Sequence, residues 1–241
     1  MSDEKRETRE DSSIKRVISS GNTELDSKMG GGLPVGSLTL IEGASGAGKS
    51  VLSQQIIWGS LHEGFTVSLF TSENSVKSLV SQMQSIDLDT IDFLLMGKFR
   101  VFPMQLARLG AQAPSNLVRA MTQERSRDIL IVDSFTSAIA HASTDLHVLS
   151  FFEHCKRLCA NGSTIMITLH AHAIQDDLID ALRSMCDAHL LLRSEQDGQK
   201  LVKTLQVTKI RGAASVTGAI VGFDVEPGWG MRVIPISKAR G

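Results

Sequence analysis

The chain has 241 residues, of which 42% are hydrophobic and 21% are charged, and its formal net charge is -1. A chain of this length buries about 70–75% of its unfolded surface, so its stability needs no disulfide or structural metal. The balanced charge argues against a protein that binds nucleic acid mainly by electrostatic attraction. Its few cysteines are Cys155, Cys159 and Cys186, and they give no sign of an oxidising compartment. Cys155 and Cys159 lie four residues apart in a segment of helical spacing and are expected to be buried thiols.

The amino-terminal segment alternates acids and bases and has almost no apolar residue, so we expect residues 1–16 to form a flexible charged tail. It lacks the apolar stretch of a signal peptide. No apolar run in the chain reaches the roughly 18 residues that a membrane-spanning helix requires. We therefore expect a cytoplasmic protein with a single domain over 17–241, whose association with a membrane would be made through partner proteins.

From residue 37 onward, short apolar runs alternate with segments of helical spacing. We expect strands at 37–43, 66–73, 98–103, 128–134 and 163–170, and helices at 50–64, 76–86, 116–127, 147–162 and 176–185. Strands that alternate with helices indicate a parallel sheet with helices on both faces.

The pattern changes after residue 187. Two strands joined by a turn at Asp197-Gly198 are expected there, followed by one or two more strands within 218–236. The predicted fold class is therefore α/β, with a mostly parallel central sheet and a C-terminal antiparallel β-meander.

The segment 43–50 reads GASGAGKS and matches G-x-x-x-x-G-K-[ST] in full, between a predicted strand and a predicted helix. Its glycines let backbone N–H groups point at phosphate oxygens, and the helix adds the positive end of its dipole. Lys49 is placed to reach the β- and γ-phosphates, and the Ser50 hydroxyl to bind Mg²⁺. We predict an ATP site formed by this P-loop and the next residue: Gly43, Ala44, Ser45, Gly46, Ala47, Gly48, Lys49, Ser50 and Val51.

A P-loop also needs a second carboxylate for Mg²⁺ at the end of a neighbouring buried strand. Asp133 ends the most apolar strand and fits this role, whereas Asp128 at the start of that strand is expected to be a turn residue. We expect the strand of Asp133 to lie beside the P-loop strand.

Hydrolysis further requires a group that orients or deprotonates the attacking water. Glu73 follows the strand 66–73 and would emerge at the same edge of the sheet, whereas the adjacent Asn74 cannot act as a base. His170 ends the strand 163–170, where it is either a sensor of the γ-phosphate or a structural histidine. His172 is less well placed for sensing.

The segment 21–50, GNTELDSKMGGGLPVGSLTLIEGASGAGKS, resembles the RecA-type ATPases and, within them, the KaiC-like group. The segment 208–212, TKIRG, matches the K-x-R motif of that group. The segments TSENSVKSL at 71–79 and RVFP at 100–103 resemble more closely the FlaH family of ATP-binding proteins from the archaellum, the archaeal flagellum. The resemblance spans roughly residues 20–236.

This resemblance implies site residues beyond the P-loop. In RecA-type proteins the glutamate after the second strand activates water, which corresponds to Glu73. The KaiC-like pattern has two adjacent acids there, and because this chain has Asn74 we expect slow hydrolysis. The K-x-R pair reaches the nucleotide of the neighbouring subunit in KaiC-like rings, which corresponds to Lys209 and Arg211. RecA-type proteins often have glutamine where this chain has His170, which also favours a nucleotide sensor.

The resemblance implies the following partners. We expect a homo-oligomeric ring, with a hexamer as the candidate size, in which bound ATP controls assembly and docking to the motor ATPase FlaI. Scaffold proteins of the archaellum platform would hold this complex at the membrane.

Two other functions fit a RecA-type core. A recombination ATPase acting on DNA needs mobile basic loops with stacking aromatic residues, whereas 170–187 is acidic and has no aromatic residue. We therefore expect no nucleic-acid partner. A KaiC-like autokinase needs an acceptor hydroxyl near the nucleotide, and Ser72, Ser75, Ser134 and Thr136 are candidates that the sequence does not separate.

Overall fold

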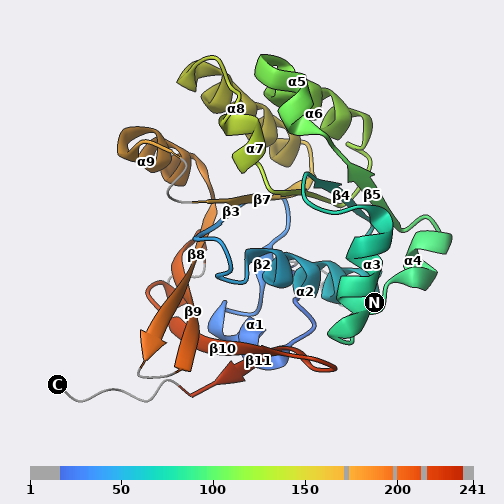
Figure 1. Ribbon diagram of the computed structural model, residues 1–241, viewed down its shortest axis with the longest axis vertical. Helices are drawn as coiled ribbons and strands as arrows, with labels where there is room; N and C mark the ends of the chain where they lie inside the picture. Colours follow the sequence, from blue (N-terminus) through green and yellow to red (C-terminus); the bar gives the residue numbers. More distant parts are fainter. Residues whose placement is uncertain (1–16, 171–173, 198–199, 213–215, 236–241) are drawn as a thin grey trace, which may run out of the picture.

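The computed structural model describes residues 17–170, 174–197, 200–212 and 216–235 (Figure 1). The predicted tail, His172 and the Gly198 half of the predicted turn lie outside these residues. The strands are β1 Val17–Ile18, β2 Leu33–Pro34, β3 Leu38–Gly43, β4 Val67–Thr71, β5 Phe99–Pro103, β6 Ile129–Asp133, β7 Thr164–Leu169, β8 Ala188–Asp197, β9 Lys200–Ile210, β10 Ile220–Glu226 and β11 Gly230–Ile234. The helices are α1 Thr23–Lys28, α2 Lys49–His62, α3 Val76–Ser85, α4 Ile91–Leu95, α5 Leu106–Leu109, α6 Ala113–Gln123, α7 Thr136–Ile139, α8 Asp145–Ala160 and α9 Asp176–Met185.

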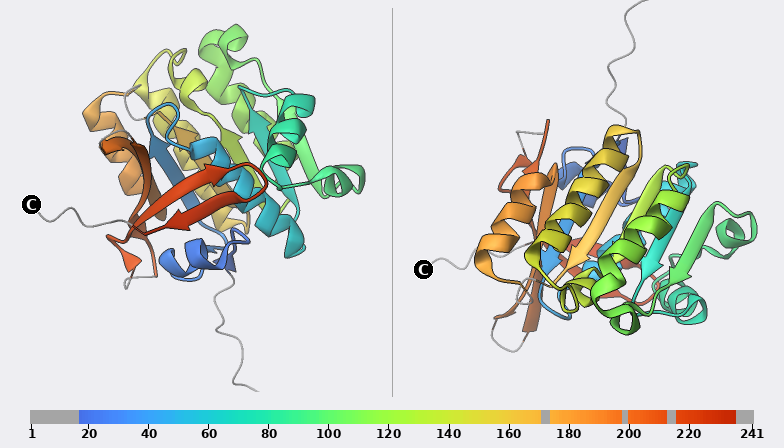
Figure 2. Two further views of the ribbon diagram at one scale, coloured as in Figure 1. Left: turned by 60° about the horizontal axis from the view of Figure 1, so that its bottom comes forward. Right: turned by 90° about the horizontal axis from the view of Figure 1, so that it is seen from above.

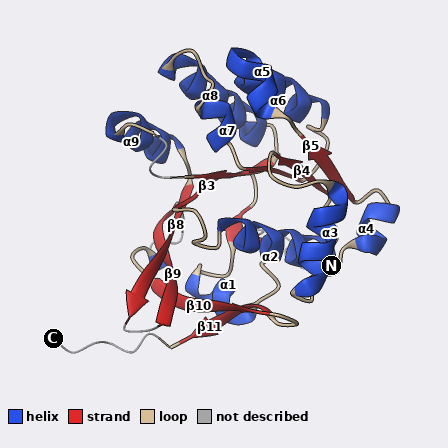
Figure 3. Ribbon diagram, viewed as in Figure 1, coloured by secondary structure: helices blue, strands red, loops and turns tan. Residues whose placement is uncertain are grey.

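The main sheet has the strand order β11-β10-β9-β8-β3-β7-β6-β4-β5. The pairs from β8 to β5 are parallel, and the pairs from β8 to β11 are antiparallel (Figure 3). The expected α/β class, with a parallel core and a C-terminal meander, is therefore confirmed. The short pair β1 and β2 forms a separate antiparallel ladder.

Helices cover both faces of the parallel core (Figures 1 and 2). One hydrophobic cluster includes buried residues of α1, α2 and α3, and the other includes buried residues of α5, α6, α7, α8 and α9. Every residue of β3, β4, β6 and β7 is buried, which explains why these strands read as continuous apolar runs. Cys155 and Cys159 are free thiols buried in the second cluster, as expected, and Cys186 is buried there as well.

Several short helices were not expected. The helices α1, α4, α5 and α7 have four to six residues, which is too short for a helical period to be read from sequence. The helix expected at 116–127 begins earlier, at Ala113, and ends at Gln123. Within the described part of the chain, no helix has the length and hydropathy needed to span a membrane.

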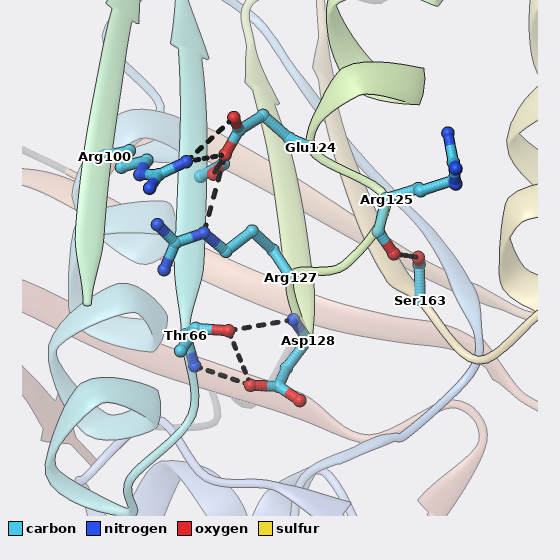
Figure 4. Close-up of polar contacts among 8 residues, drawn as sticks. Thr66, Arg100, Glu124, Arg125, Arg127, Asp128 and Ser163 are labelled. Atoms are coloured by element: carbon cyan, nitrogen blue, oxygen red, sulfur yellow. Dashed lines mark hydrogen bonds and ion pairs between the residues drawn. The ribbon is translucent and has the colours of Figure 1, made fainter. Parts of the chain in front are cut away.

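The residues that follow α6 join the amino ends of three strands (Figure 4). Asp128, expected to be a turn residue, accepts hydrogen bonds at 2.7 Å from both the backbone N–H and the hydroxyl of Thr66. Glu124 forms ion pairs with Arg100 at 3.1 Å and Arg127 at 3.5 Å. These contacts hold the amino ends of β4, β5 and β6 together, whereas the P-loop lies at the carboxyl ends of the parallel strands.

The β10–β11 hairpin lies below α2 in Figure 1 and crosses in front of it in the left view of Figure 2. The side chain of Gln55 on α2 accepts a hydrogen bond from the backbone N–H of Met231 at 3.2 Å and donates to the carbonyl of Ser20 at 3.0 Å. Asn22 donates to the carbonyl of Met231 at 2.6 Å. The meander, the segment 20–22 and α2 are therefore tied together.

Candidate nucleotide-binding site

The P-loop connects the carboxyl end of β3 to α2. Two of its glycines are required by close contacts: a Cβ on Gly43 would lie 2.5 Å from the carbonyl oxygen of Leu192, and one on Gly48 would lie 3.0 Å from the ring of Phe223. Gly48 also has a φ of 101°, which side-chain-bearing residues rarely adopt. Strands β8 and β10 therefore pack directly against the loop, and the free N–H groups of α2 lie at its end.

Lys49 is the first residue of α2 and is buried. Its ammonium donates to the carbonyls of Gly43 at 3.0 Å and Ala44 at 2.7 Å. Burial lowers the pKa of Lys49, while the nearby carboxylates of Asp133 and Glu73 oppose this shift. The loop therefore contains a cation whose hydrogen-bond partners are neutral carbonyl groups.

Asp133 lies at the carboxyl end of β6 and is buried. Its Oδ1 accepts hydrogen bonds from Thr168 at 2.6 Å and from Ser50 at 3.3 Å. Burial raises the pKa of Asp133, and the bonds from Thr168 and Ser50 oppose that effect. Hydroxyl and carboxylate oxygens are the ligands that Mg²⁺ prefers.

The expectation that β6 neighbours the P-loop strand was wrong. Strand β7 lies between β3 and β6, because both pair with it. This insertion places Thr168, a residue that sequence reasoning missed, between Asp133 and the P-loop strand. The sequence feature that could have indicated this residue is a hydroxyl side chain one position before the end of the apolar strand β7.

Glu73 and Asn74 follow β4 but face different partners. The Glu73 carboxylate is exposed and accepts a hydrogen bond from the Ser134 hydroxyl at 3.2 Å. The Asn74 side chain instead accepts a bond from Ser78 on α3 at 3.3 Å. The backbone N–H groups of both residues donate to Thr71. Of these two side chains, only the Glu73 carboxylate therefore has a hydrogen bond to a residue at the carboxyl end of β6.

His170 follows β7 and is half-buried, and its backbone N–H donates to Thr136 at 3.0 Å. Burial lowers the pKa of its imidazole, the positive Lys49 adds to this effect, and Glu73 opposes it. The imidazole is therefore less readily protonated than an exposed histidine.

Lys49, Glu73 and His170 line a cavity of about 430 Å³, whereas Asp133 is not among its lining residues. Its lining residues are Ser45, Gly46, Gly48, Lys49, Ser50, Val51, Glu73, His170, Lys203 and Val225. The structure thus brings Glu73 and His170 together with the P-loop. Lys203 on β9 and Val225 on β10 were missed, because the antiparallel register that brings them here cannot be read from sequence. No ion pair of Lys203 is found within the described residues.

Lys209 and Arg211 do not line this cavity. Lys209 is half-buried and donates to the carbonyls of Arg183 at 3.4 Å and Ser184 at 3.3 Å, at the end of α9. Arg211 forms an ion pair with Asp187 at 3.1 Å. Asp187 also accepts from the backbone N–H of Leu38, the first residue of β3. The two cations therefore lie toward the amino end of β3, whereas the P-loop follows its carboxyl end.

A buried carboxylate directly before the P-loop was also missed. Glu42 has 1% of its surface exposed and is bonded to His189 on β8 at 2.9 Å and to Arg183 on α9 at 2.9 Å through Nε. Burial alone would raise the pKa of Glu42, but the bonds from His189 and Arg183 lower it to about 2. The sequence feature that could have indicated this residue is a single charged side chain in the otherwise uncharged strand LTLIEG. Glu42 links the P-loop strand to α9.

Comparisons with known proteins match nearly the whole chain. The KaiC ATPase family matches residues 18–238. The archaeal flagellar ATP-binding protein FlaH of Sulfolobus acidocaldarius is 30% identical over 229 residues, which are 93% of this chain and 99% of that protein. FlaH of Methanocaldococcus jannaschii is 26% identical over 87% of this chain and 91% of that protein. The crystal structure of flagellar accessory protein FlaH from Methanocaldococcus jannaschii superposes with a TM-score of 0.83 at 23% identity, covering 92% of this chain and 99% of that one.

Proposed function

Because this chain belongs to the KaiC family of ATPases and, within it, to the FlaH proteins of the archaellum, we propose that it binds Mg-ATP next to Lys49 and uses it to control self-assembly. Assembly in turn would govern docking to the motor ATPase FlaI and to scaffold proteins of the archaellum platform. The protein would act in the cytoplasm, at the membrane only through these partners.

Nucleotide binding rests on one observation: a buried ammonium and the amino end of a 14-residue helix face the same 430 Å³ cavity. The carbonyls of Gly43 and Ala44 hold the ammonium of Lys49, and phosphate oxygens would replace them as stronger, charged acceptors. The helix dipole and its free N–H groups favour the same anion. Lys203, which also lines the cavity, adds a second positive charge.

The residues beside Lys49 fit a magnesium ion. Ser50 would bind the ion through its hydroxyl, and Asp133 would hold it through a coordinated water. When bound, the ion neutralises charge on the phosphate oxygens. Thr168 fixes the orientation of the Asp133 carboxylate by its 2.6 Å bond.

The proposal of slow hydrolysis is supported by the carboxylates available at the cavity. Among its described lining residues, Glu73 is the single acid, and it would orient or deprotonate the attacking water. Its carboxylate is exposed and bonded to Ser134, so the water around it is not excluded. Asn74 is turned to Ser78 and adds no base. This arrangement favours a protein that retains ATP over one that turns it over quickly.

Control of assembly rests on the position of Lys209 and Arg211. Neither reaches the nucleotide cavity of its own chain, and the Arg211 side chain is 58% exposed. If both contact the γ-phosphate bound by a neighbouring copy, ATP becomes part of the interface between subunits. Loss of that phosphate would leave two cations unpaired at a desolvated contact, which costs several kcal/mol for each buried charge.

The assembly step is tested by light scattering of the Arg211→Ala variant with ATP and with ADP. We expect the variant to bind ATP as tightly as the wild type but to lose ATP-dependent self-association and to bind FlaI more weakly. Arg119→Ala is the matched control, because Arg119 is an exposed arginine on α6. The same oligomer with ATP, with ADP and in the Arg211 variant would rule out this mechanism.

A further inference from the structure

A second concave surface lies away from the nucleotide cavity, and we call it the tryptophan groove. It has a volume of about 770 Å³ and lies between α1, α2, the end of α3 and the β10–β11 hairpin. Its walls include Trp58 on α2 and Trp229 in the hairpin turn. These are the two tryptophans of the chain, so both of its largest aromatic side chains face one groove.

Trp229 is unusually exposed for such a large apolar side chain. Three-quarters of its surface (75%) is open to solvent, whereas Ile86, Leu88 and Met231 in the same groove are buried. Exposed tryptophan beside an apolar floor is typical of a surface that binds another protein, because indole contributes much of the binding energy at such interfaces.

The walls of the groove are held in place without a partner. The hairpin turn is fixed by a hydrogen bond from the Gly228 N–H to the Ser85 carbonyl at 3.2 Å. Trp58 contacts the ring of His62 at a centroid distance of 4.1 Å, and His62 contacts Phe93 on α4 at 5.0 Å. A preformed surface of this kind loses little entropy when it binds.

The charge of the groove indicates what it would accept. Glu24 on α1 and Asp87 after α3 both line it, and neither side chain has a hydrogen bond or ion pair within the described residues. The cation of the groove, Arg232, is paired with Glu226 at 3.6 Å. The groove therefore presents two unpaired carboxylates beside exposed indole.

We propose that the tryptophan groove binds a segment of a partner protein that carries a lysine or arginine among apolar side chains. The cation stacks on the indole of Trp229, the aromatic face that attracts cations best, and Glu24 and Asp87 select its sign. The apolar side chains pack against Trp58 and Val233, which line the groove and are only partly buried. This proposal does not rest on the proposed nucleotide function, because none of the lining residues of the groove lines the nucleotide cavity.

Tryptophan fluorescence of the full chain tests this directly, since both tryptophans line the groove. The probe is a capped nine-residue peptide of alternating leucine and arginine, and its control is the leucine–glutamate peptide of the same length. We expect a saturable change in emission with the arginine peptide and none with the glutamate peptide. Equal responses to both peptides, or none to either, would overturn the proposal.

Two variants separate the contributions of charge and ring. We expect about a tenfold higher Kd for the arginine peptide in two variants, the double variant Glu24→Gln with Asp87→Asn and the single variant Trp229→Ala. In Trp229→Ala, the fluorescence of Trp58 reports binding. Trp229 and both carboxylates are exposed, so each variant should keep the wild-type melting temperature. Leu146→Ala, at an exposed leucine on α8, is the control and should leave the Kd unchanged. Unchanged Kd in both groove variants would refute the assignment.

Other occupants of the groove give different results. If Trp229→Ala alters self-association without peptide, the occupant is a second copy of this chain and the proposal fails. If Trp229→Ala abolishes pelleting with vesicles of phosphatidylserine, the occupant is a membrane and the proposal likewise fails. Lys49→Ala should bind the arginine peptide normally, so failure of the nucleotide function and failure of the groove are distinguishable.

Discussion

The two ends of β3 hold their cations in different ways. At the carboxyl end, the Lys49 ammonium is buried and bonded to neutral carbonyls of its own loop. At the amino end, Arg211 is exposed and paired with Asp187, which is also bonded to Lys156 at 2.6 Å. A buried cation without a hydrogen-bonded carboxylate is ready for an anionic ligand, whereas a paired cation must first be released by a competing anion. Under the proposed function, the first end would bind phosphate within one chain, and the second would bind a phosphate held by a neighbouring copy.

Substitution of Lys49 gives the largest expected effect and tests the first half of this comparison. Lys49→Ala should weaken ATP binding about a thousandfold, because it removes charge-assisted bonds to phosphate that contribute about 1.5–3 kcal/mol each. Isothermal titration calorimetry measures this loss. Lys77→Ala, at an exposed lysine on α3, should bind as the wild type does. An unchanged Kd in Lys49→Ala would remove the nucleotide assignment.

Acid unfolding tests the buried Glu42 that connects the P-loop strand to α9. The pKa of Glu42 is lowered from 4.5 to about 2 in the folded protein, so folding favours its ionised form. The stabilisation is complete above pH 4.5 and is lost as pH falls toward 2. From the size of the shift it amounts to about 3 kcal/mol.

Urea unfolding at several pH values, compared between wild type and Glu42→Gln, measures this contribution. We expect the difference in unfolding free energy to shrink as the pH falls from 5 to 2.5. Asp92→Asn, at an exposed acid on α4, should show no such trend. A difference in unfolding free energy that stays constant with pH would mean that the charge of Glu42 does not stabilise the folded protein.

Substitution of Glu73 has a smaller expected effect and is confined to turnover. Glu73→Gln should lower ATP hydrolysis at least about tenfold while leaving the Kd for ATP nearly unchanged, because the amide cannot act as a base. The wild-type rate itself should fall well below the enzyme median of about 10 per second. A phosphate-release assay checks both. Wild-type turnover at the median would contradict the regulatory function and favour a motor.

Substitution of Asp187 gives the smallest expected effect and tests the second half of the comparison. Asp187→Asn keeps an acceptor for the Leu38 N–H but weakens the hold on Arg211. Exposed ion pairs contribute about 0.2–1 kcal/mol, so self-association with ATP should strengthen no more than a few-fold. Light scattering measures this, and the double variant with Arg211→Ala should lose the gain. If the stronger self-association persists in the double variant, Arg211 is not the side chain whose release from Asp187 strengthens assembly.

Much of the fold could be predicted because its central strands are buried on both faces. Runs such as 128–134 and 163–170 are continuously apolar for that reason, and the P-loop between 37–43 and 50–64 fixed the position of the candidate site. The spatial order of the strands could not be predicted. Nothing in the sequence indicates that β7 enters between β3 and β6, so Thr168 was missed as a partner of Asp133.

The contributions of the meander were the least predictable part of the site. Lys203 and Val225 reach the cavity through the antiparallel pairing of β9 and β10, whose register places Lys203 opposite Phe223. A shift of one residue would turn Lys203 to the other face of the sheet. Glu42 was missed for a related reason, since its partners Arg183 and His189 lie more than 140 residues away in sequence.

The β10–β11 hairpin and α2 border both concave surfaces of the molecule. Helix α2 supplies Lys49 to the nucleotide cavity and Trp58 to the tryptophan groove, while the hairpin supplies Val225 to the first and Trp229 to the second. If a ligand in one of these surfaces changes the affinity of the other surface for its ligand, the effect is reciprocal by thermodynamic necessity. A protein that tightened ATP binding about fivefold from the groove would itself be held about fivefold more tightly by the ATP-bound state. The two affinities could then be tuned only together.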